Sequence, residues 1–99
     1  MTNTAVSLTI PVELFGTPRL RTGRGRIDLE LHARTTRQEV VAVLATACPE
    51  LVGYAILSDL SDLEQGFVFN LSGREFLGDD PFSLKPGDSL LLLSSQAGG

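Results

Sequence analysis

The feature that most constrains the fold is the apolar stretch SLLLLS at residues 89–94, close to the last residue of the sequence. Four consecutive leucines are far short of the roughly 20 apolar residues that a membrane span needs, and they predict a buried strand instead. The preceding KPGD predicts a tight turn, because Pro86 fixes one backbone dihedral and Gly87 permits unusual ones. We therefore expect a sheet that buries a strand five residues from the end of the chain.

Two earlier stretches alternate apolar and polar residues, as half-buried strands do. The inward positions are Ile10, Val12 and Leu14 in LTIPVELFG, and Ile27, Leu29 and Leu31 in RIDLELH. The segment TPRLRTGRGR between them is rich in Gly and Arg and predicts a turn or loop, so the two strands should form a hairpin. Pro11 has no N–H, and we expect it at the strand's beginning, at a bulge, or with its nitrogen turned away from the neighbouring strand.

The period changes to that of a helix in TRQEVVAVLATAC. Thr36 followed three residues later by Glu39 has the form of a capping box, and Pro49 predicts that the helix ends near Cys48. The expected inward positions of this helix are Val40, Val43, Leu44 and Ala47.

After the helix, residues 49–66 show no single periodicity, which predicts irregular backbone with a short helical turn. The sequence pattern does not indicate where residues 52–66 lie in the fold. The stretch FVFNLSGREFL predicts two short strands about a Ser72–Gly73 turn. Its inward positions are Phe67, Phe69 and Leu71.

The order of these elements predicts an α+β fold of the β-grasp type, with a mixed sheet of four to five strands and one main helix packed diagonally across it. If the first and last strands are neighbours, they must run parallel. We expect one domain over residues 1–94, with residues 1–7 frayed, and a flexible Gly-Gly tail over residues 95–99.

The charge of the chain argues against nucleic acid as the main partner, because the formal net charge is −4. Four of the eight basic residues lie together without an acid between them, at Arg19, Arg21, Arg24 and Arg26. The remaining four basic and twelve acidic side chains balance to −8, so most of the surface should be acidic and suit a basic partner groove. No aromatic residues for base stacking lie among these arginines, which favours a solvated loop, with a contact to an acidic partner as the alternative.

Other reactive side chains predict no catalytic or metal site. Cys48 is the only cysteine, so it forms no internal disulfide, and together with the lack of an export signal it favours a cytoplasmic protein. At the end of a helix it is expected to be a buried apolar residue rather than a nucleophile. His32 is out of phase with the inward positions and should face solvent, and zinc would need more His or Cys ligands. The acids Asp59, Asp62, Glu64, Asp79 and Asp80 lack calcium-loop spacing and are expected to be solvated.

The five residues after the last strand, SQAGG from Ser95 to Gly99, contain no large apolar group that could hold them to the core. Fully extended they would reach about 17 Å, enough to enter an active site of another protein. Two glycines without Cβ atoms could pass through a narrow channel. The carboxylate of Gly99 could then attack the α-phosphorus of ATP, and a sulfur or nitrogen nucleophile could displace the resulting mixed anhydride.

The sequence resembles the ubiquitin-like sulfur carriers, which include the small subunit of molybdopterin synthase and the thiamine-pathway carrier. The residues that carry this resemblance are VELFG, TTRQEVVAVLATACPEL, FSLKPGDSLLLL and the final AGG. Chain length and the Pro49-Glu50-Leu51 continuation of the helix are more similar to the molybdopterin synthase subunit. The resemblance implies that Ala97, Gly98 and Gly99 insert into partner enzymes and that Gly99 is adenylated and converted to a thiocarboxylate.

The same resemblance implies the partners: an ATP-dependent, E1-like activating enzyme, and a large synthase subunit or another sulfur-acceptor enzyme. The exposed sheet beside the tail would dock. ATP would be bound by the activating partner, no cofactor would stay bound to this chain, and the chain would be a carrier and a substrate without catalytic activity of its own. The alternatives are a sulfur carrier for thiamine or another metabolite, a protein modifier joined to lysines, and a plain interaction domain.

Overall fold

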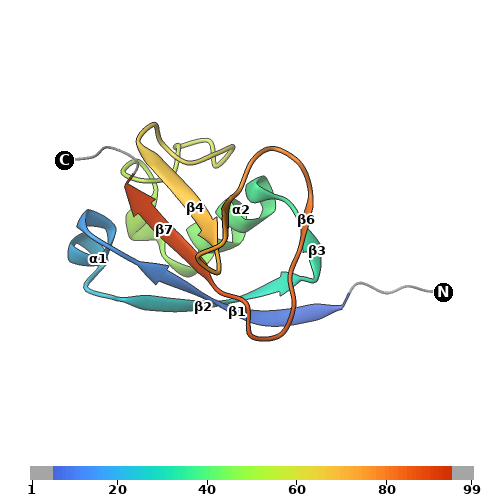
Figure 1. Cartoon of the computed structure of the whole chain (residues 1–99). Coiled ribbons are helices and arrows are strands. Elements are labelled where there is room, and N and C mark those ends of the chain that lie inside the picture. Colours follow the sequence, from blue (N-terminus) through green and yellow to red (C-terminus); the bar gives the residue numbers. More distant parts are fainter. Residues whose placement is uncertain (1–5, 95–99) are drawn as a thin grey trace.

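The first, second and last strands lie side by side in one sheet (Figure 1). The computed structural model describes residues 6–94. Strand β1 (Ser7–Leu14) pairs with β2 (Arg26–His32) in antiparallel register, and it pairs with β7 (Leu90–Ser94) in parallel register, with Val12 opposite Leu90. The predicted hairpin and the predicted parallel pair are therefore confirmed.

Two short strands complete the sheet beyond β7. Strand β4 (Phe67–Leu71) is antiparallel to both β7 and β5 (Glu75–Phe76), which gives the strand order β2-β1-β7-β4-β5. The predicted turn is formed by Ser72 and Gly73 with φ of 53° and 74°, and the Arg74 N–H donates to the Leu71 carbonyl across it (2.9 Å). A separate antiparallel pair joins β3 (Arg34–Thr35) to β6 (Phe82–Ser83). The mixed sheet thus has five strands, within the predicted range.

Helix α2 (Arg37–Ala47) covers one face of the sheet and lies behind it in Figure 1. The Thr36 hydroxyl accepts a hydrogen bond from the Glu39 N–H (3.2 Å), as a capping box requires. The Glu39 carboxylate bonds the buried Thr35 hydroxyl instead (3.0 Å). The Cys48 N–H donates to the Leu44 carbonyl (2.7 Å), and the helix ends before Pro49 as predicted.

The buried side of α2 is wider than predicted. Val40 and Leu44 are buried as expected, whereas Val43 is only half-buried and Val41 is fully buried. The 3-10 helix η1 (Pro49–Leu51) follows α2 directly and contacts it, and Leu51 of η1 is buried with Val41 in the same core cluster. Residues 52–66 are irregular, as predicted, with isolated bridges from Ile56 to Val52 and Leu63.

The prediction of a loop between β1 and β2 is wrong, because residues Thr17–Thr22 form a short helix, α1. Gly16 and Gly23 flank it with φ of 62° and 72°, and buried Pro18 stands in its first turn. The Thr22 hydroxyl donates to the Pro18 carbonyl (2.9 Å). Gly and Pro are common in loops, but at these positions they begin and end a helix.

Pro11 lies within β1 rather than at its beginning. It stands opposite Asp28 of β2, and the pairing with β7 begins only at Val12. At Pro11 one edge of β1 therefore lacks a partner strand among residues 6–94, which is where a residue without an N–H is tolerated.

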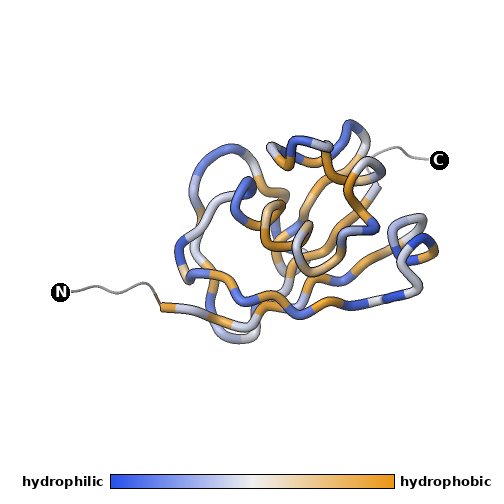
Figure 2. The backbone as a smooth tube through the Cα atoms, turned by 180° about the vertical axis from the view of Figure 1, so that it is seen from behind, coloured by the Kyte–Doolittle hydropathy of each residue, from blue (hydrophilic) through white to orange (hydrophobic). Residues whose placement is uncertain are grey.

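The core lies between α2 and the sheet. Figure 2 shows the apolar segments concentrated in the strands and in the helix. The largest side chains with almost no exposed surface are Phe69, Ile10, Leu14, Leu29, Leu44, Leu51, Ile56, Leu90 and Leu92. Within residues 6–94 there is no helix with the length and apolar character needed to cross a membrane.

Candidate functional site

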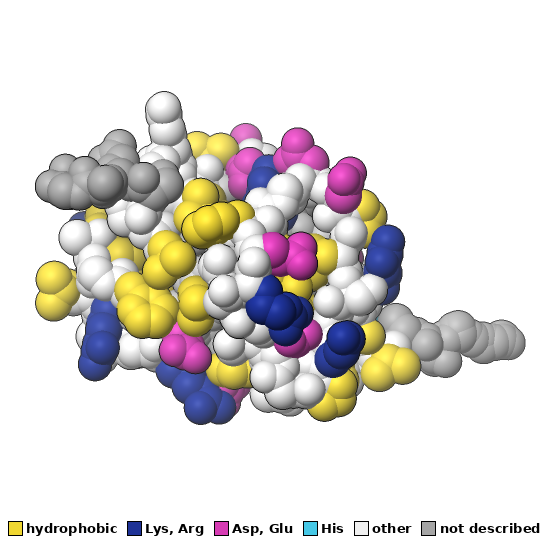
Figure 3. Space-filling view, in the orientation of Figure 1, with side chains coloured by type: hydrophobic (Ala, Val, Ile, Leu, Met, Phe, Trp, Pro, Cys, Tyr) yellow, Lys and Arg dark blue, Asp and Glu magenta, His cyan; other side chains and the backbone are white. Residues whose placement is uncertain are grey.

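Strand β7 has one face in the core and one face turned away from α2. Leu90 and Leu92 are completely buried, whereas Leu91 and Leu93 are half-buried and lie opposite Asn70 and Val68 of β4. Together with the exposed Phe76 of β5 they form a surface that we call the outer apolar face, which consists of Val68, Phe76, Leu91 and Leu93. Figure 3 shows hydrophobic side chains gathered over β7.

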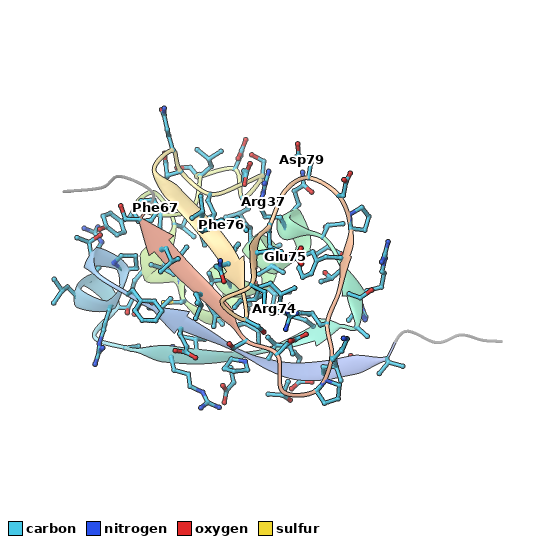
Figure 4. The ribbon with its side chains drawn as sticks, viewed as in Figure 1. Arg37, Phe67, Arg74, Glu75, Phe76 and Asp79 are labelled. Carbon is cyan, nitrogen blue, oxygen red and sulfur yellow. The ribbon has the colours of Figure 1, made fainter. Side chains whose placement is uncertain are left out.

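The outer apolar face reaches the last residue of β7. A shallow hollow of about 370 Å³ is lined by Val68, Phe76, Leu93 and Ser94. Phe76 is 64% exposed, although it is a large aromatic side chain (Figure 4). Contiguous exposed apolar surface of this kind is typical of binding sites. The face is therefore a candidate binding surface, and it lies directly beside Ser94, the last described residue.

A buried polar group lies on the same side of the sheet. Asn70 stands between Leu91 and Phe76 in the strand register and is only 8% exposed. Its Oδ1 atom accepts no hydrogen bond from any described residue. Unpaired buried polar atoms are uncommon, because each costs about 1–3 kcal/mol. This part of the sheet is therefore not optimised for stability alone.

The start of β7 is held by the buried carboxylate of Asp88. It accepts hydrogen bonds from the Lys85 N–H (2.9 Å), the Ser72 hydroxyl (2.8 Å) and the Arg74 guanidinium (3.3 Å). The backbone hydrogen bond from Lys85 is the main cause that holds the pKa of Asp88 below its usual value, although burial opposes it. Because these bonds join the KPGD turn to the Ser72–Gly73 turn, they fix β7 in register with β4. The predicted turn at Pro86 and Gly87 is confirmed, since the Asp88 N–H donates to the Lys85 carbonyl (3.0 Å) and Gly87 has φ of 93°.

Helix α1 lies beside the other end of β7 (Figure 1). The Arg21 guanidinium lies 4.6 Å from the centre of the Tyr54 ring, and that ring lies 5.7 Å from the ring of Phe67. Phe67 in turn pairs with Ser94. Arg19, Arg21, Arg24 and Arg26 are exposed, as predicted, but two of them stand on a helix rather than in a loop.

Gly99, which is predicted to react, and Ala97 and Gly98, which are predicted to insert into partner enzymes with it, lie outside the described residues, so their roles stay predictions. What the sequence reasoning missed is the identity of the outer apolar face. A signal was available, because leucines at Leu91 and Leu93 as well as at Leu90 and Leu92 indicate a strand that is apolar on both sides.

Cys48 and His32 occupy the positions predicted for them. Cys48 is buried and its Sγ donates to the Glu50 carboxylate (3.3 Å). Burial, and secondly this hydrogen bond, raise the pKa of the Cys48 thiol, which opposes formation of a nucleophilic thiolate. His32 is exposed. Residues 6–94 contain no group of three or more His, Cys, Asp or Glu side chains that could hold a metal ion.

The loop acids are exposed or half-exposed, as predicted, but two of them also bind one arginine. The half-buried Arg37 contacts Asp62 (3.0 Å) and Asp79 (2.6 Å). Both contacts start from the first residue of α2, and Figure 4 shows Arg37 and Asp79 pointing toward one another. These acids therefore tie two long loops to the helix rather than forming a ligand site.

The mixed sheet, with parallel first and last strands and a helix across one face, defines a ubiquitin-like β-grasp protein. No protein-family model matches the sequence, and no curated protein matches it. Among solved structures, the chain is similar to SAMP1 from Haloferax volcanii, with a TM-score of 0.71 and 22% identity over 92% of this chain and 99% of that one.

A second structure, of H. volcanii small archaeal modifier protein 1, gives a TM-score of 0.67 and 20% identity over 85% of this chain and 93% of that one. The solution structure of the Haloferax volcanii HVO 2177 protein gives 0.70 and 20% identity, over 100% of this chain and 93% of that one. At these identities the likeness establishes the shared β-grasp fold.

Proposed function

We propose that this protein is a sulfur carrier whose Gly99 carboxylate is activated by a separate ATP-dependent enzyme. The observation that carries the proposal is the position of the outer apolar face, which extends to Ser94 at the end of β7. From that residue the sequence continues for only five residues, ending in Gly98-Gly99. A partner that docks on the face would receive the two glycines within about 17 Å of Ser94.

The chemistry needs no catalytic group from this chain. The Gly99 carboxylate oxygen attacks the α-phosphorus of ATP, and the bond from that phosphorus to the pyrophosphate oxygen breaks. A sulfur donor at the oxidation level of hydrosulfide then attacks the acyl carbon of the adenylate. AMP leaves with the electron pair of the broken bond, and Gly99 becomes a thiocarboxylate. Gly98 and Gly99 present no Cβ atoms to the walls of the channel, and Ala97 presents one methyl group.

The partners follow from this chemistry. An E1-like activating enzyme binds ATP and the tail, and a sulfur-acceptor enzyme takes the tail afterwards. The resemblance to the small subunit of molybdopterin synthase favours the large synthase subunit as that acceptor, in a cytoplasmic pathway of molybdenum cofactor synthesis. No permanently bound cofactor is required by this chain.

The outer apolar face has the features of a docking site shared by both partners. Phe76 is a large exposed aromatic group of the kind that anchors interfaces, and Val68, Leu91 and Leu93 surround it with apolar surface. Because β7 carries both the face and the tail, docking fixes the direction in which Gly99 leaves the body.

The direct test is ATP–pyrophosphate exchange with the purified E1-like enzyme of the source organism. Deletion of Gly98 and Gly99 should abolish exchange and leave the urea unfolding curve unchanged, because neither residue belongs to the described core. The matched control deletes Thr2 and Asn3 at the opposite end of the chain, and it should exchange at the full rate. Full exchange by the protein without its two glycines would contradict the proposal.

Intact-mass measurement of protein purified from its native cells tests the sulfur step. The expected species ends at Gly99 and is heavier by the replacement of one oxygen with one sulfur. It should return to the carboxylate mass after incubation with the acceptor enzyme and its precursor. A tail that extends past Gly99 uncleaved would overturn the assignment.

A second candidate function is protein modification, and one observation favours it. The chain is similar in fold to a protein named small archaeal modifier protein 1. In that case a lysine amine of a target attacks the same adenylate, loses its proton and displaces AMP to form an isopeptide bond. Covalent species larger than this chain on a denaturing blot, dependent on Gly99, would distinguish this function. Lys85 is the only lysine of the chain and hence its single side-chain site for self-conjugation.

A further inference from the structure

Three arginines at one end of the molecule make no ion pair with any described residue. They are Arg19, Arg21 and Arg24, and all three are exposed. Arg26 pairs with Asp28 (2.9 Å), and Arg37 and Arg74 pair with further aspartates. Arg34 also has no ion pair among the described residues, but it donates a hydrogen bond to the Ser83 hydroxyl (3.0 Å). The charge of Arg24 acts on the Glu50 carboxylate without a direct ion pair. In a chain with a surplus of acids, unpaired arginines gathered at one place need an explanation.

The short helix α1 holds two of these arginines in a fixed position. Its ends are set by Gly16 and Gly23, and Pro18 is buried against the body. Arg21 is further held by its contact with the Tyr54 ring, at 4.6 Å. Side chains that are already ordered lose less conformational entropy on binding. The segment is therefore an ordered, helical basic projection rather than an irregular loop.

An apolar residue stands among these charges. Leu20, between Arg19 and Arg21, is 82% exposed, the largest exposed fraction among the large hydrophobic residues described. We use the term α1 knob for Arg19, Leu20, Arg21 and Arg24. Arginines beside an exposed aliphatic group are typical of protein interfaces, in which arginine is enriched.

The α1 knob lies at the end of the molecule from which the tail continues. The contacts from Arg21 through Tyr54 and Phe67 lead to Ser94, the last residue of β7. Because only five residues separate Ser94 from Gly99, an enzyme that binds Gly99 must face this end of the body. The exposed Arg34 of β3 lies at the opposite end (Figure 1).

We infer that the α1 knob binds an acidic surface of the activating enzyme beside the channel that receives the tail. The inference rests on the proposed function. Complementary charges at the rim of an interface accelerate encounter and orient it, and here they would direct the tail end of an otherwise acidic body toward its enzyme. A single-stranded nucleic acid is a poorer match, because Arg21 already covers one face of the Tyr54 ring, where a base would stack beside these arginines.

The test measures ATP–pyrophosphate exchange by the E1-like enzyme at varied concentrations of this protein. The double variant Arg19→Glu/Arg24→Glu should raise KM about tenfold or more at about 0.1 M salt, because like charges then oppose, with kcat unchanged. At about 1 M salt, where the Debye length falls from about 10 Å to about 3 Å, the difference from wild type should largely disappear. The matched control is Arg34→Glu, an exposed arginine at the other end whose KM should stay within twofold of wild type.

Each outcome decides a different statement. An equal KM for the double variant and wild type overturns the acidic contact while the proposed function stands. A KM raised equally by Arg34→Glu shows a general charge effect and also overturns it. If wild type binds a fluorescent single-stranded RNA, the double variant does not, and the KM of exchange is the same for both, the α1 knob binds nucleic acid and the acidic contact is overturned. No exchange by wild-type protein overturns the proposed function itself. Urea unfolding of each variant excludes loss of fold as the cause.

Discussion

The two faces of β7 contain the same residue type in different environments. Leu90 and Leu92 are completely buried against α2, whereas Leu91 and Leu93 are half-buried on the outer apolar face. Stability accounts for the inner pair, since full burial of a leucine is worth roughly 1.5–3 kcal/mol. It does not account for the outer pair, because a sheet face turned to water is usually polar in alternation. The apolar character of the outer pair is therefore consistent with the docking role proposed for this face.

The comparison is sharpest for single truncations within β7. Leu92→Ala should lower the free energy of unfolding by about 3–5 kcal/mol, because it removes buried methyl groups and leaves a cavity beside Phe69. Leu91→Ala removes the same atoms from the outer apolar face and should cost about 1 kcal/mol. Urea unfolding at equilibrium measures both values. Equal losses would mean that the two faces do not differ in packing.

The second prediction concerns Asp88, whose hydrogen bonds hold β7 in register with β4 and so determine which leucines face the core. Asp88→Ala removes the acceptor of the Lys85, Ser72 and Arg74 hydrogen bonds and should cost about 2–3 kcal/mol at neutral pH. Because the pKa of Asp88 is lowered in the folded protein, its contribution is complete above the unfolded pKa of about 3.9. The contribution is lost as pH falls through the folded pKa.

The difference in unfolding free energy between wild type and Asp88→Ala should therefore shrink below about pH 4. The control is Asp80→Ala, which replaces an exposed loop acid and should change the free energy of unfolding by less than about 0.5 kcal/mol at neutral pH. If this difference in unfolding free energy stays constant below about pH 4, the contribution of Asp88 comes from packing rather than from its charge.

The sequence predicted most of the core between α2 and the sheet, but little of the outer apolar face. Period-two and period-3.6 patterns predict the core strands and α2, because burial of alternate residues imposes those periods. The register that brings Phe76 beside Val68 depends on the Ser72–Gly73 turn and on Asp88, which pair residues distant in sequence. Short strands such as β5, with two residues, carry no period to recognise. Helix α1 was missed because its six residues have too few turns for a pattern, and its Gly and Pro residues were interpreted as loop residues.

The variant with the smallest expected change in stability, Leu93→Ser, tests whether the outer apolar face takes part in docking. Leu93→Ser makes the hollow at the end of β7 polar and should alter the free energy of unfolding by less than about 1 kcal/mol. It should nevertheless raise KM in ATP–pyrophosphate exchange about tenfold if Leu93 is one of the few interface residues whose truncation costs more than about 1 kcal/mol of binding. Exchange kinetics with the E1-like enzyme and urea unfolding measure the two quantities.

The control for this prediction is Val6→Ser, which makes the same kind of change at an aliphatic residue that is 62% exposed. Val6 precedes β1, and because β1 and β7 run parallel with Val12 opposite Leu90, it lies at the end of this strand pair opposite to Ser94. Val6→Ser should leave both KM and unfolding near wild type. If Leu93→Ser also left KM unchanged, the outer leucines would have no role in docking, and the apolar character of that face would need a different partner. If instead Leu93→Ser cost as much stability as Leu92→Ala, the distinction between the two faces of β7 would fail, because a residue needed for folding cannot be assigned to binding by its loss.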